Sequence, residues 1–167
     1  MNIRILTTVF YVGTLRPASG TWGSAAAVAL GLLIHGLGGF PLLALATVAV
    51  TALGFWSVAR DMATREASDT DPSEIVIDEV AGQWLALLAP SLGFWMAGLD
   101  SWNFPWPGWV GAFVLFRLFD IWKPWLVGRA DRMGGTVGVM LDDLIAGLFA
   151  GIGVFLAAGL YHGVIMA

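Results

Sequence analysis

Long apolar stretches separated by short polar ones dominate this chain of 167 residues. A helix needs roughly 20 apolar residues to cross a bilayer, with a usable range of about 17 to 25. Five stretches approach that length, at residues 22–37, 41–58, 80–99, 105–122 and 144–167. The pattern therefore predicts an all-α fold, a polytopic membrane helical bundle of about four to five transmembrane helices.

The first apolar stretch and the N-terminus need separate interpretation. Stretch 22–37 is short, and the glycine-rich sequence after it ends at Pro41, a helix breaker. The first two stretches therefore either cross the membrane separately or form a tight or re-entrant hairpin. Residues 1–13 hold Arg4 and a short apolar run without a small-residue cleavage site, so we expect an N-terminal interfacial helix there. Without an internal repeat, residues 1–167 are expected to form one domain.

Composition strengthens the membrane interpretation. Hydrophobic residues make up 58% of the chain and charged residues 12%, and the mean hydropathy is +0.81. A water-soluble domain of this size could hardly bury so much apolar surface in one core, so lipid is the expected solvent. The absence of cysteine excludes disulfides, thiolate metal sites and a cysteine nucleophile. No basic patch suggests a nucleic-acid partner.

Charged residues are strongly segregated along the predicted topology. If the five stretches alternate across the membrane, one side carries all eight basic residues: Arg4, Arg16, Arg60, Arg65, Arg117, Lys123, Arg129 and Arg132. The positive-inside rule assigns that side to the cytoplasm and the C-terminus to the outside. Eleven of the twelve acidic residues share the cytoplasmic side, and only Asp100 lies opposite. Since carboxylates contribute little to insertion, another property must gather them.

Carboxylates stand at the cytoplasmic ends of three predicted helices. Asp78 and Glu79 begin the third, Asp120 lies near the end of the fourth, and Asp142 and Asp143 begin the fifth. Mg²⁺ prefers oxygen ligands and is commonly bound by one or two carboxylates together with waters and substrate phosphate. The simpler interpretation is that acids at helix starts complement the helix dipole, which does not explain an acid near a helix C-terminus.

Basic residues surround the acid at the end of the fourth predicted helix. Arg117 and Lys123 lie three residues to either side of Asp120 and share its helical face. They form either a structural ion pair or the cationic part of a phosphate site. Arg129 and Arg132 add positive charge in the same loop, either for the substrate or for anionic lipids.

A small polar turn opens the first predicted helix, with the sequence GTWGS at residues 20–24. Glycines and hydroxyl groups at a helix start can present backbone N–H groups to an anion. Thr21, Gly23 and Ser24 are therefore candidate substrate-binding residues. The alternative is that Thr21 or Ser24 merely caps the helix.

Four sequence blocks, read in order, resemble the phosphatidylglycerophosphatase A family: GTWGS at 20–24, IDEVAG at 77–82, FRLFDIWKP at 116–124 and MLDDLIAG at 140–147. The resemblance covers nearly the whole chain. It implies a multi-pass enzyme of the bacterial inner membrane that uses Mg²⁺ to hydrolyse phosphatidylglycerophosphate to phosphatidylglycerol and inorganic phosphate. The catalytic residues that it implies are Asp78, Glu79, Asp120, Lys123, Asp142 and Asp143.

Two positions depart from the pattern of that family. Leu126 stands where a second proline is frequent, and Met133 stands where relatives often have a histidine. Neither change removes a carboxylate.

The expected mechanism follows from this set of residues. Mg²⁺ would be held at the cytoplasmic face by some of Asp78, Glu79, Asp142 and Asp143, while Lys123 and Arg117 offset charge on the transferring phosphate. One carboxylate could activate a water, or Asp120 could attack directly and form an aspartyl phosphate. The sequence leaves both routes open.

Other classes of function remain open at this point. The buried acids could form the cytoplasmic mouth of a small cation transporter or channel, although a path would need polar residues through the whole bilayer. The chain could also be a non-catalytic assembly subunit. Gly147, Gly151 and Gly153 could support a homo-oligomer or pack within one subunit.

Overall fold

The computed structural model describes residues 3–64, 73–103 and 105–161, and within these ranges the chain contains helices and no strand. The elements are α1 (Ile3–Thr7), the 3₁₀ turn η1 (Val12–Thr14), α2 (Ser19–Met62), α3 (Ile77–Met96), α4 (Trp106–Trp122), α5 (Leu126–Asp131) and α6 (Gly135–Leu160). The predicted all-α class is confirmed.

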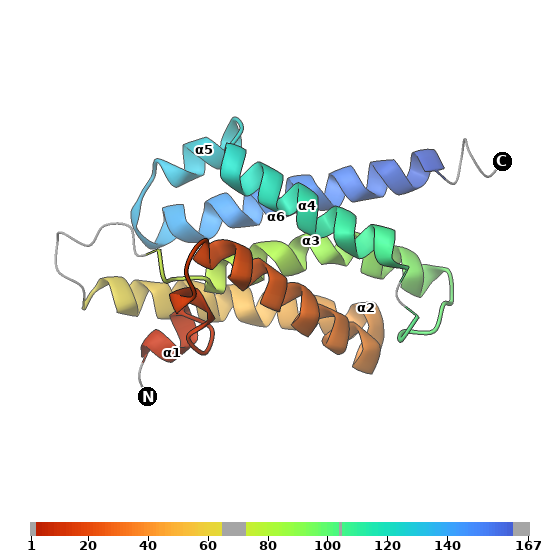
Figure 1. The fold of residues 1–167 in the computed structure, drawn as a ribbon, viewed down its shortest axis with the longest axis horizontal. Coiled ribbons are helices and arrows are strands. Elements are labelled where there is room, and N and C mark those ends of the chain that lie inside the picture. The colour runs from red at the N-terminus through yellow and green to blue at the C-terminus, as the bar shows by residue number, and fades with distance from the viewer. Residues whose placement is uncertain (1–2, 65–72, 104, 162–167) are drawn as a thin grey trace.

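Helix α2 is a hairpin of two helical arms rather than one rod (Figure 1). Its backbone leaves the helical region at Gly38, with φ −153°, and at Gly39, with φ 62° and ψ −158°. Glycine adopts the second conformation without a Cβ clash, and Pro41 directly after it withholds a backbone N–H. The first two predicted stretches therefore form a tight helical hairpin, and the first arm begins at Ser19 instead of residue 22. Two membrane-crossing arms and a re-entrant pair are both compatible with this hairpin.

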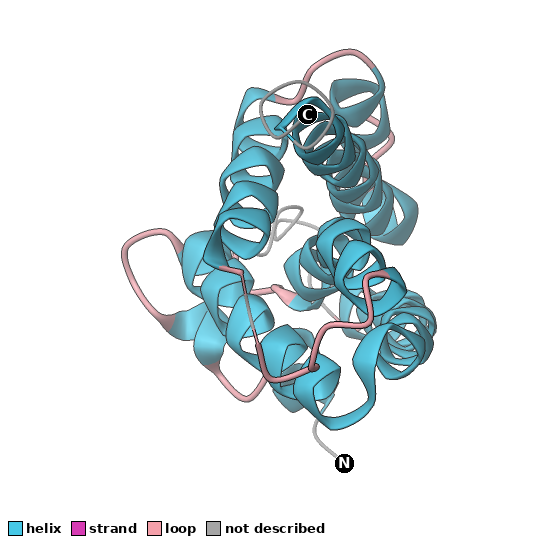
Figure 2. Ribbon diagram, turned by 90° about the vertical axis from the view of Figure 1, so that its right-hand side faces the viewer, coloured by secondary structure: helices cyan, strands magenta, loops and turns pink. Residues whose placement is uncertain are grey.

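The two arms of α2, then α3, α4 and α6, run alternately in opposite directions along the long axis of the molecule (Figure 1). Viewed nearly end-on, they lie side by side as a bundle (Figure 2). Alternation brings the start and end of α2, the start of α3, the end of α4, α5 and the start of α6 to the left of Figure 1. These segments and the turns next to them, with α1, carry the described basic residues, whereas Arg65 lies outside the described residues.

Helix α3 forms the centre of the bundle, in contact with α2, α4 and α6. Eleven of its twenty residues are buried, compared with three of seventeen in α4. The core joins Leu87 of α3 to Leu43 of α2, Phe116 of α4 and Ala150 of α6. Two polar contacts tie α3 to α2: the Trp84 indole N–H donates to the Ala27 carbonyl at 2.7 Å, and His35 Nδ1 lies 2.8 Å from Ser91 Oγ.

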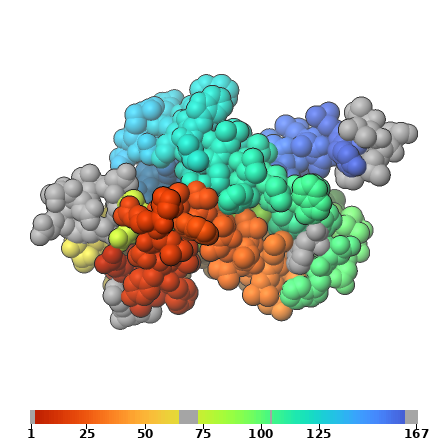
Figure 3. All heavy atoms as spheres, in the orientation of Figure 1, coloured from red at the N-terminus to blue at the C-terminus, as the bar shows by residue number. Residues whose placement is uncertain are grey.

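Apolar side chains also cover much of the outer surface, including Leu45, Val48, Ile121 and Phe155, each about two-thirds exposed or more. Helices α2 and α6 are long and apolar enough to cross a membrane, and each contains an 18-residue stretch with a mean hydropathy of 2.0. The far end of α6, blue at the right of Figure 3, stands apart from the green residues at the end of α3. Helices α2 and α6 and the exposed apolar side chains favour membrane association, because large exposed apolar areas are unfavourable in water. The count of four to five transmembrane helices stays a prediction.

The N-terminal segment is less helical than expected over residues 1–13. Helix α1 ends at Thr7, and the backbone of Val9, Phe10 and Tyr11 has positive φ before η1 begins. The segment is held against the start of α3 instead, because the Val76 N–H donates to the Thr7 carbonyl at 2.9 Å. Its interfacial position stays a prediction.

Glycines of α6 pack inside the chain itself. A Cβ at Gly147 would meet α3, one at Gly151 would lie 3.7 Å from Ala86 O of α3, and one at Gly153 would lie 2.9 Å from Leu115 of α4. These small residues are thus explained by packing within one subunit. Self-association is still only a prediction, and residues 162–167 of the fifth predicted stretch lie outside the described residues.

Candidate active site

Helices α3 and α6 touch backbone to backbone where two glycines face each other. A Cβ at Gly147 would lie 2.1 Å from the carbonyl oxygen of Gly82, and a Cβ at Gly82 would lie 2.4 Å from the carbonyl oxygen of Asp143. Asp78 precedes Gly82 by four residues and Asp143 precedes Gly147 by four, so each acid lies one turn from the crossing on the same helical face. The crossing therefore brings the acids of the two helices together.

Three carboxylates meet at this crossing: Asp78, Glu79 and Asp143 each offer an oxygen, and these oxygens lie within 4.8 Å of one another. Asp78 is 8% exposed and Asp143 4% exposed. Glu79 Oε2 is buried and finds no hydrogen-bond partner among the described residues. Two unit charges about 5 Å apart repel by roughly 3 kcal/mol at an effective dielectric constant of 20, so such a cluster calls for a positive charge.

The donor set fits a hard divalent cation. All the available ligand atoms are carboxylate oxygens, and one of them, Glu79 Oε2, lacks another partner within the described part of the chain. Magnesium and calcium prefer this chemistry, and magnesium commonly needs only one or two carboxylates beside water and phosphate. Asp78, Glu79 and Asp143 are thus the residues that could hold the metal.

Arg117 lies beside this cluster and links α4 to α2. Its Nη1 lies 2.5 Å from Asp120 Oδ2 and donates to Ser24 Oγ at 3.4 Å. A Cβ at Gly20 would lie 2.3 Å from Glu79 Oε1 and 3.2 Å from Arg117 Nη1, so the start of α2 closes over both side chains. Arg117 Nε is buried without an acceptor among the residues that the structure describes. This donor is therefore left unpaired within the described part of the protein.

Lys123 forms the second cationic position. Its Nζ donates to Asp142 Oδ2 at 2.8 Å and to Asp131 Oδ1. The residue ends α4 in the left-handed conformation, with φ 50° and ψ 53°. A non-glycine residue in this conformation costs about 1 kcal/mol, so the two ion pairs help to hold an unfavourable turn.

The ion pairs make the charge of Lys123 persistent. Burial by itself would lower the pKa of Lys123, but the hydrogen bonds to Asp131 and Asp142 outweigh it and raise the pKa above its ordinary value. A lysine whose pKa is higher in the folded than in the unfolded state stabilises the fold. This stabilisation is fully present below the pKa of the unfolded state, near 10.4, and is lost as the pH rises through the pKa of the folded state. The lysine therefore stays charged across the physiological range.

We expect Lys123→Gln to lower the melting temperature by the same amount at about pH 7 and pH 9, because the lysine is charged at both. The gap to wild type should close only in strongly alkaline solution. Thermal unfolding in detergent, followed by tryptophan fluorescence, measures the melting temperatures of both proteins at each pH. Arg129→Gln removes an equal charge from an exposed site on α5 and serves as the control. A gap that already closes between pH 7 and pH 9 would contradict the assignment.

The structure brings only some of the sequence-predicted residues together. Asp142 is separate from the three-carboxylate cluster, since Lys123 occupies its Oδ2. Gly23 packs on Val76, where a Cβ would lie 2.8 Å from the valine Cβ. Thr21 is in the first turn of α2, and its N–H donates to the Ala18 carbonyl at 3.0 Å, which removes that N–H from anion binding.

Two of the predicted arginines lie apart from the acids. Arg129 is on α5 and Arg132 follows its end, and both are exposed on the outside of the bundle. A role in contacting anionic lipid headgroups agrees with this position.

Several residues that shape the site were not predicted from the sequence to be part of it. Gly82 and Gly147 set the crossing, and each stands four residues after an aspartate in a D-x-[VI]-A-G sequence, a signal that was available. Gly20 contacts the site in place of Gly23. No sequence pattern indicated Asp131, because only the fold of α5 places it next to Lys123.

Comparisons with known proteins give a family match over most of the chain. The family model described as Phosphatidylglycerophosphatase A matches residues 5–158. Phosphatidylglycerophosphatase A of Haemophilus influenzae is 35% identical over 156 residues, which cover 92% of this chain and 86% of that protein. The Escherichia coli protein of the same name is 33% identical over 151 residues, which cover 87% and 77%.

A protein with a different name is about equally similar. It comes from Bacteroides thetaiotaomicron, is named only provisionally as a phosphatidylinositol-3-phosphatase, and is 33% identical over 152 residues, 87% of each chain. No solved structure matches.

Proposed function

Because this chain belongs to the phosphatidylglycerophosphatase A family, we propose that it hydrolyses phosphatidylglycerophosphate to phosphatidylglycerol and inorganic phosphate. The observation that carries the proposal is a buried cluster of three carboxylates with Arg117 and Lys123 close by, at one end of an otherwise apolar bundle. A phosphate monoester on a lipid needs such a site, with its charge at the surface and its acyl chains in the bilayer.

The membrane position supports the same proposal. The charged segments lie at one end of the helical arms, and the named relatives are bacterial. The positive-inside rule favours the cytoplasm for that end. We therefore place the protein in the bacterial inner membrane as a multi-pass enzyme, with the active site facing the cytoplasm.

Magnesium is the cofactor that we propose, held by Asp78, Glu79 and Asp143. When bound, it would polarise a phosphoryl oxygen and offset negative charge there. This set differs from the sequence-based one by the omission of Asp142, which we assign to the orientation of Lys123 through its 2.8 Å contact.

The basic residues bind and orient the phosphate in this proposal. Arg117 keeps Nε available as a donor within the described residues, while Asp120 and Ser24 hold its Nη1. Asp120 is thus a positioning residue for Arg117, and its carboxylate is already neutralised by an ion pair at 2.5 Å. Lys123 supplies a second positive charge that does not vary near neutral pH.

The ion pair of Asp120 favours water over this carboxylate as the nucleophile. The water oxygen forms the new bond to phosphorus, and the bond from phosphorus to the terminal glycerol oxygen breaks. A carboxylate of the cluster accepts the proton from the water, and the leaving oxygen becomes a hydroxyl when it takes up a proton. Arg117 and Lys123 stabilise the charge that builds on the phosphoryl oxygens.

The direct test is phosphate release from lipid in detergent micelles, with Mg²⁺ and with a chelator in its place. We expect Mg²⁺-dependent release from phosphatidylglycerophosphate. Phosphatidylinositol 3-phosphate and phosphatidic acid are the comparison substrates, because one relative carries an inositol-lipid name. Faster release from phosphatidylinositol 3-phosphate would mean that the substrate is an inositol lipid instead. If folded protein released phosphate from none of the three lipids, the proposed phosphatase function would be overturned.

A further inference from the structure

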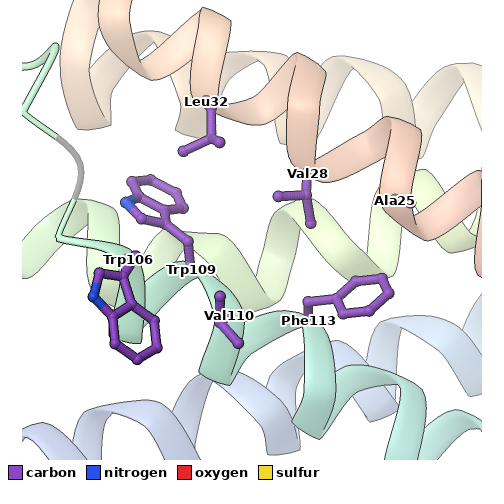
Figure 4. A pocket seen from close by; sticks show the side chains of 7 residues that line it. All are labelled: Ala25, Val28, Leu32, Trp106, Trp109, Val110 and Phe113. Atoms are coloured by element: carbon purple, nitrogen blue, oxygen red, sulfur yellow. The ribbon is translucent and has the colours of Figure 1, made fainter.

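An apolar groove lies between the first arm of α2 and α4 (Figure 4). Helix α2 contributes Ala25, Val28 and Leu32, and α4 contributes side chains between Trp106 and Phe113. The lining side chains are alanine, valine, leucine, phenylalanine and tryptophan, and the cavity volume is about 350 Å³. The groove thus offers space of apolar character on a bundle whose outer surface is itself apolar.

The groove ends at the candidate active site. On α2 the spacing Thr21, Ala25, Val28, Leu32 places a polar residue one turn before the groove on the same helical face. On α4 the corresponding stripe continues from Phe113 to Arg117, again four residues further.

The two stripes meet at the polar end of the groove. A Cβ at Gly20 would lie 3.2 Å from Arg117 Nη1, and Ser24, directly before Ala25, accepts a hydrogen bond from that nitrogen. On both helices that line the groove, apolar side chains therefore give way to polar ones that could bind phosphate, and they do so at the same end of the groove.

We propose that this groove holds one acyl chain of the lipid whose phosphate binds at Arg117. The inference rests on the proposed lipid phosphatase function and adds an acyl-chain subsite to it. From Ala25 to Leu32 the groove follows the helix for about 10 Å, which a chain attached to the bound headgroup can follow from the site into the bilayer. Trp106 and Val110, which line the groove, are 71% and 48% exposed and offer apolar surface to that chain.

The subsite predicts a preference that depends on acyl-chain length. Val110→Trp should fill the groove, because Val110 is a half-exposed lining residue. We expect the ratio of kcat/KM for dipalmitoyl over dihexanoyl phosphatidylglycerophosphate to fall by about tenfold or more, since each methylene of lost contact weakens binding severalfold. Val114→Trp is the matched control, one turn away on α4, similarly exposed and outside the groove lining.

Each outcome is decisive. An unchanged ratio in folded, active Val110→Trp would overturn the groove subsite while the phosphatase function stands. Failure of the wild-type protein to hydrolyse either lipid would instead overturn the function.

A second measurement needs no variant and so covers the case in which Val110→Trp does not fold. Phosphatidylglycerophosphate with a diazirine in one acyl chain is photolysed in micelles with the wild-type protein. Labelling should concentrate on residues 25–32 and 106–113 and be competed by unlabelled substrate but not by phosphatidylcholine. Equal competition by both lipids, or labelling spread over all lipid-facing helices, would overturn the proposal in favour of a groove filled by bulk lipid.

Discussion

Asp143→Asn is expected to lower phosphate release by roughly 100- to 1,000-fold and, in the presence of a chelator, to raise the melting temperature. The two effects have one cause. Asp143 stands within 4.8 Å of Asp78 and Glu79 in a site with little access to water. Three carboxylates in this site bind a cation, which in turn binds the phosphate. Without the cation the three carboxylates repel one another and destabilise the fold.

Magnesium should distinguish the two proteins in thermal unfolding. Ligand that binds only the folded state raises its stability, so Mg²⁺ should raise the melting temperature of the wild type and leave Asp143→Asn nearly unchanged. Asp100→Asn is the control, because Asp100 lies in the turn after α3, at the opposite end of the bundle, where its side chain accepts the N–H of Trp102. An active Asp143→Asn protein would refute the assignment of the cluster.

Gly147→Ala is expected to be the most destabilising single-methyl change in the site. Its Cβ would lie 2.1 Å from the carbonyl oxygen of Gly82, and a backbone atom of the central helix cannot move aside at low cost. The helices must separate, which we expect to cost about 3 kcal/mol and to lower the melting temperature by roughly 10 °C. Activity should fall too, because the separation moves Asp143 away from Asp78.

The next glycine on the same face supplies the control. A Cβ at Gly151 would lie 3.7 Å from the carbonyl oxygen of Ala86, an ordinary contact. Gly151→Ala should therefore keep activity and stabilise the helix by up to about 1 kcal/mol, the difference in helix propensity. Melting temperatures and phosphate release of the two variants, measured side by side, test the crossing. Equal stability of both variants would show that the helices do not touch at Gly147.

These predictions describe a site whose charge chemistry depends on close backbone packing. The glycines remove side chains where α3 and α6 cross, and the acids one turn away then share a space without much water. Arg117 and Lys123 approach from α4 and are each held by a carboxylate of their own, Asp120 and Asp142. At this end of the bundle Asp78, Glu79 and Asp143 can thus hold a metal, while Asp142 pairs with Lys123. Asp120 pairs with Arg117 and also contacts Asp143 of the cluster.

Much of the fold and of the candidate site was predictable from the sequence by itself. The apolar stretches, the break before Pro41 and the gathering of charge at one end depend on local composition and on the alternation of helices, which need no knowledge of contacts. The hairpin turn at Gly38 and Gly39 lies where the breaker was expected. The four blocks that resemble the family also identified the acids and bases that the structure brings to the site.

Only the tertiary structure decided which of those residues share a space. Asp142 and Asp143 are neighbours in the chain but point about 100° apart around the helix, so one step in sequence separates two roles. The contact of Gly147 with Gly82 sets the rotation of α6, turning Asp143 toward α3 and leaving Asp142 to Lys123. The rotation of a helix about its own axis is set by contacts between residues far apart in the chain. The hydrophobic pattern of the sequence does not reveal those contacts.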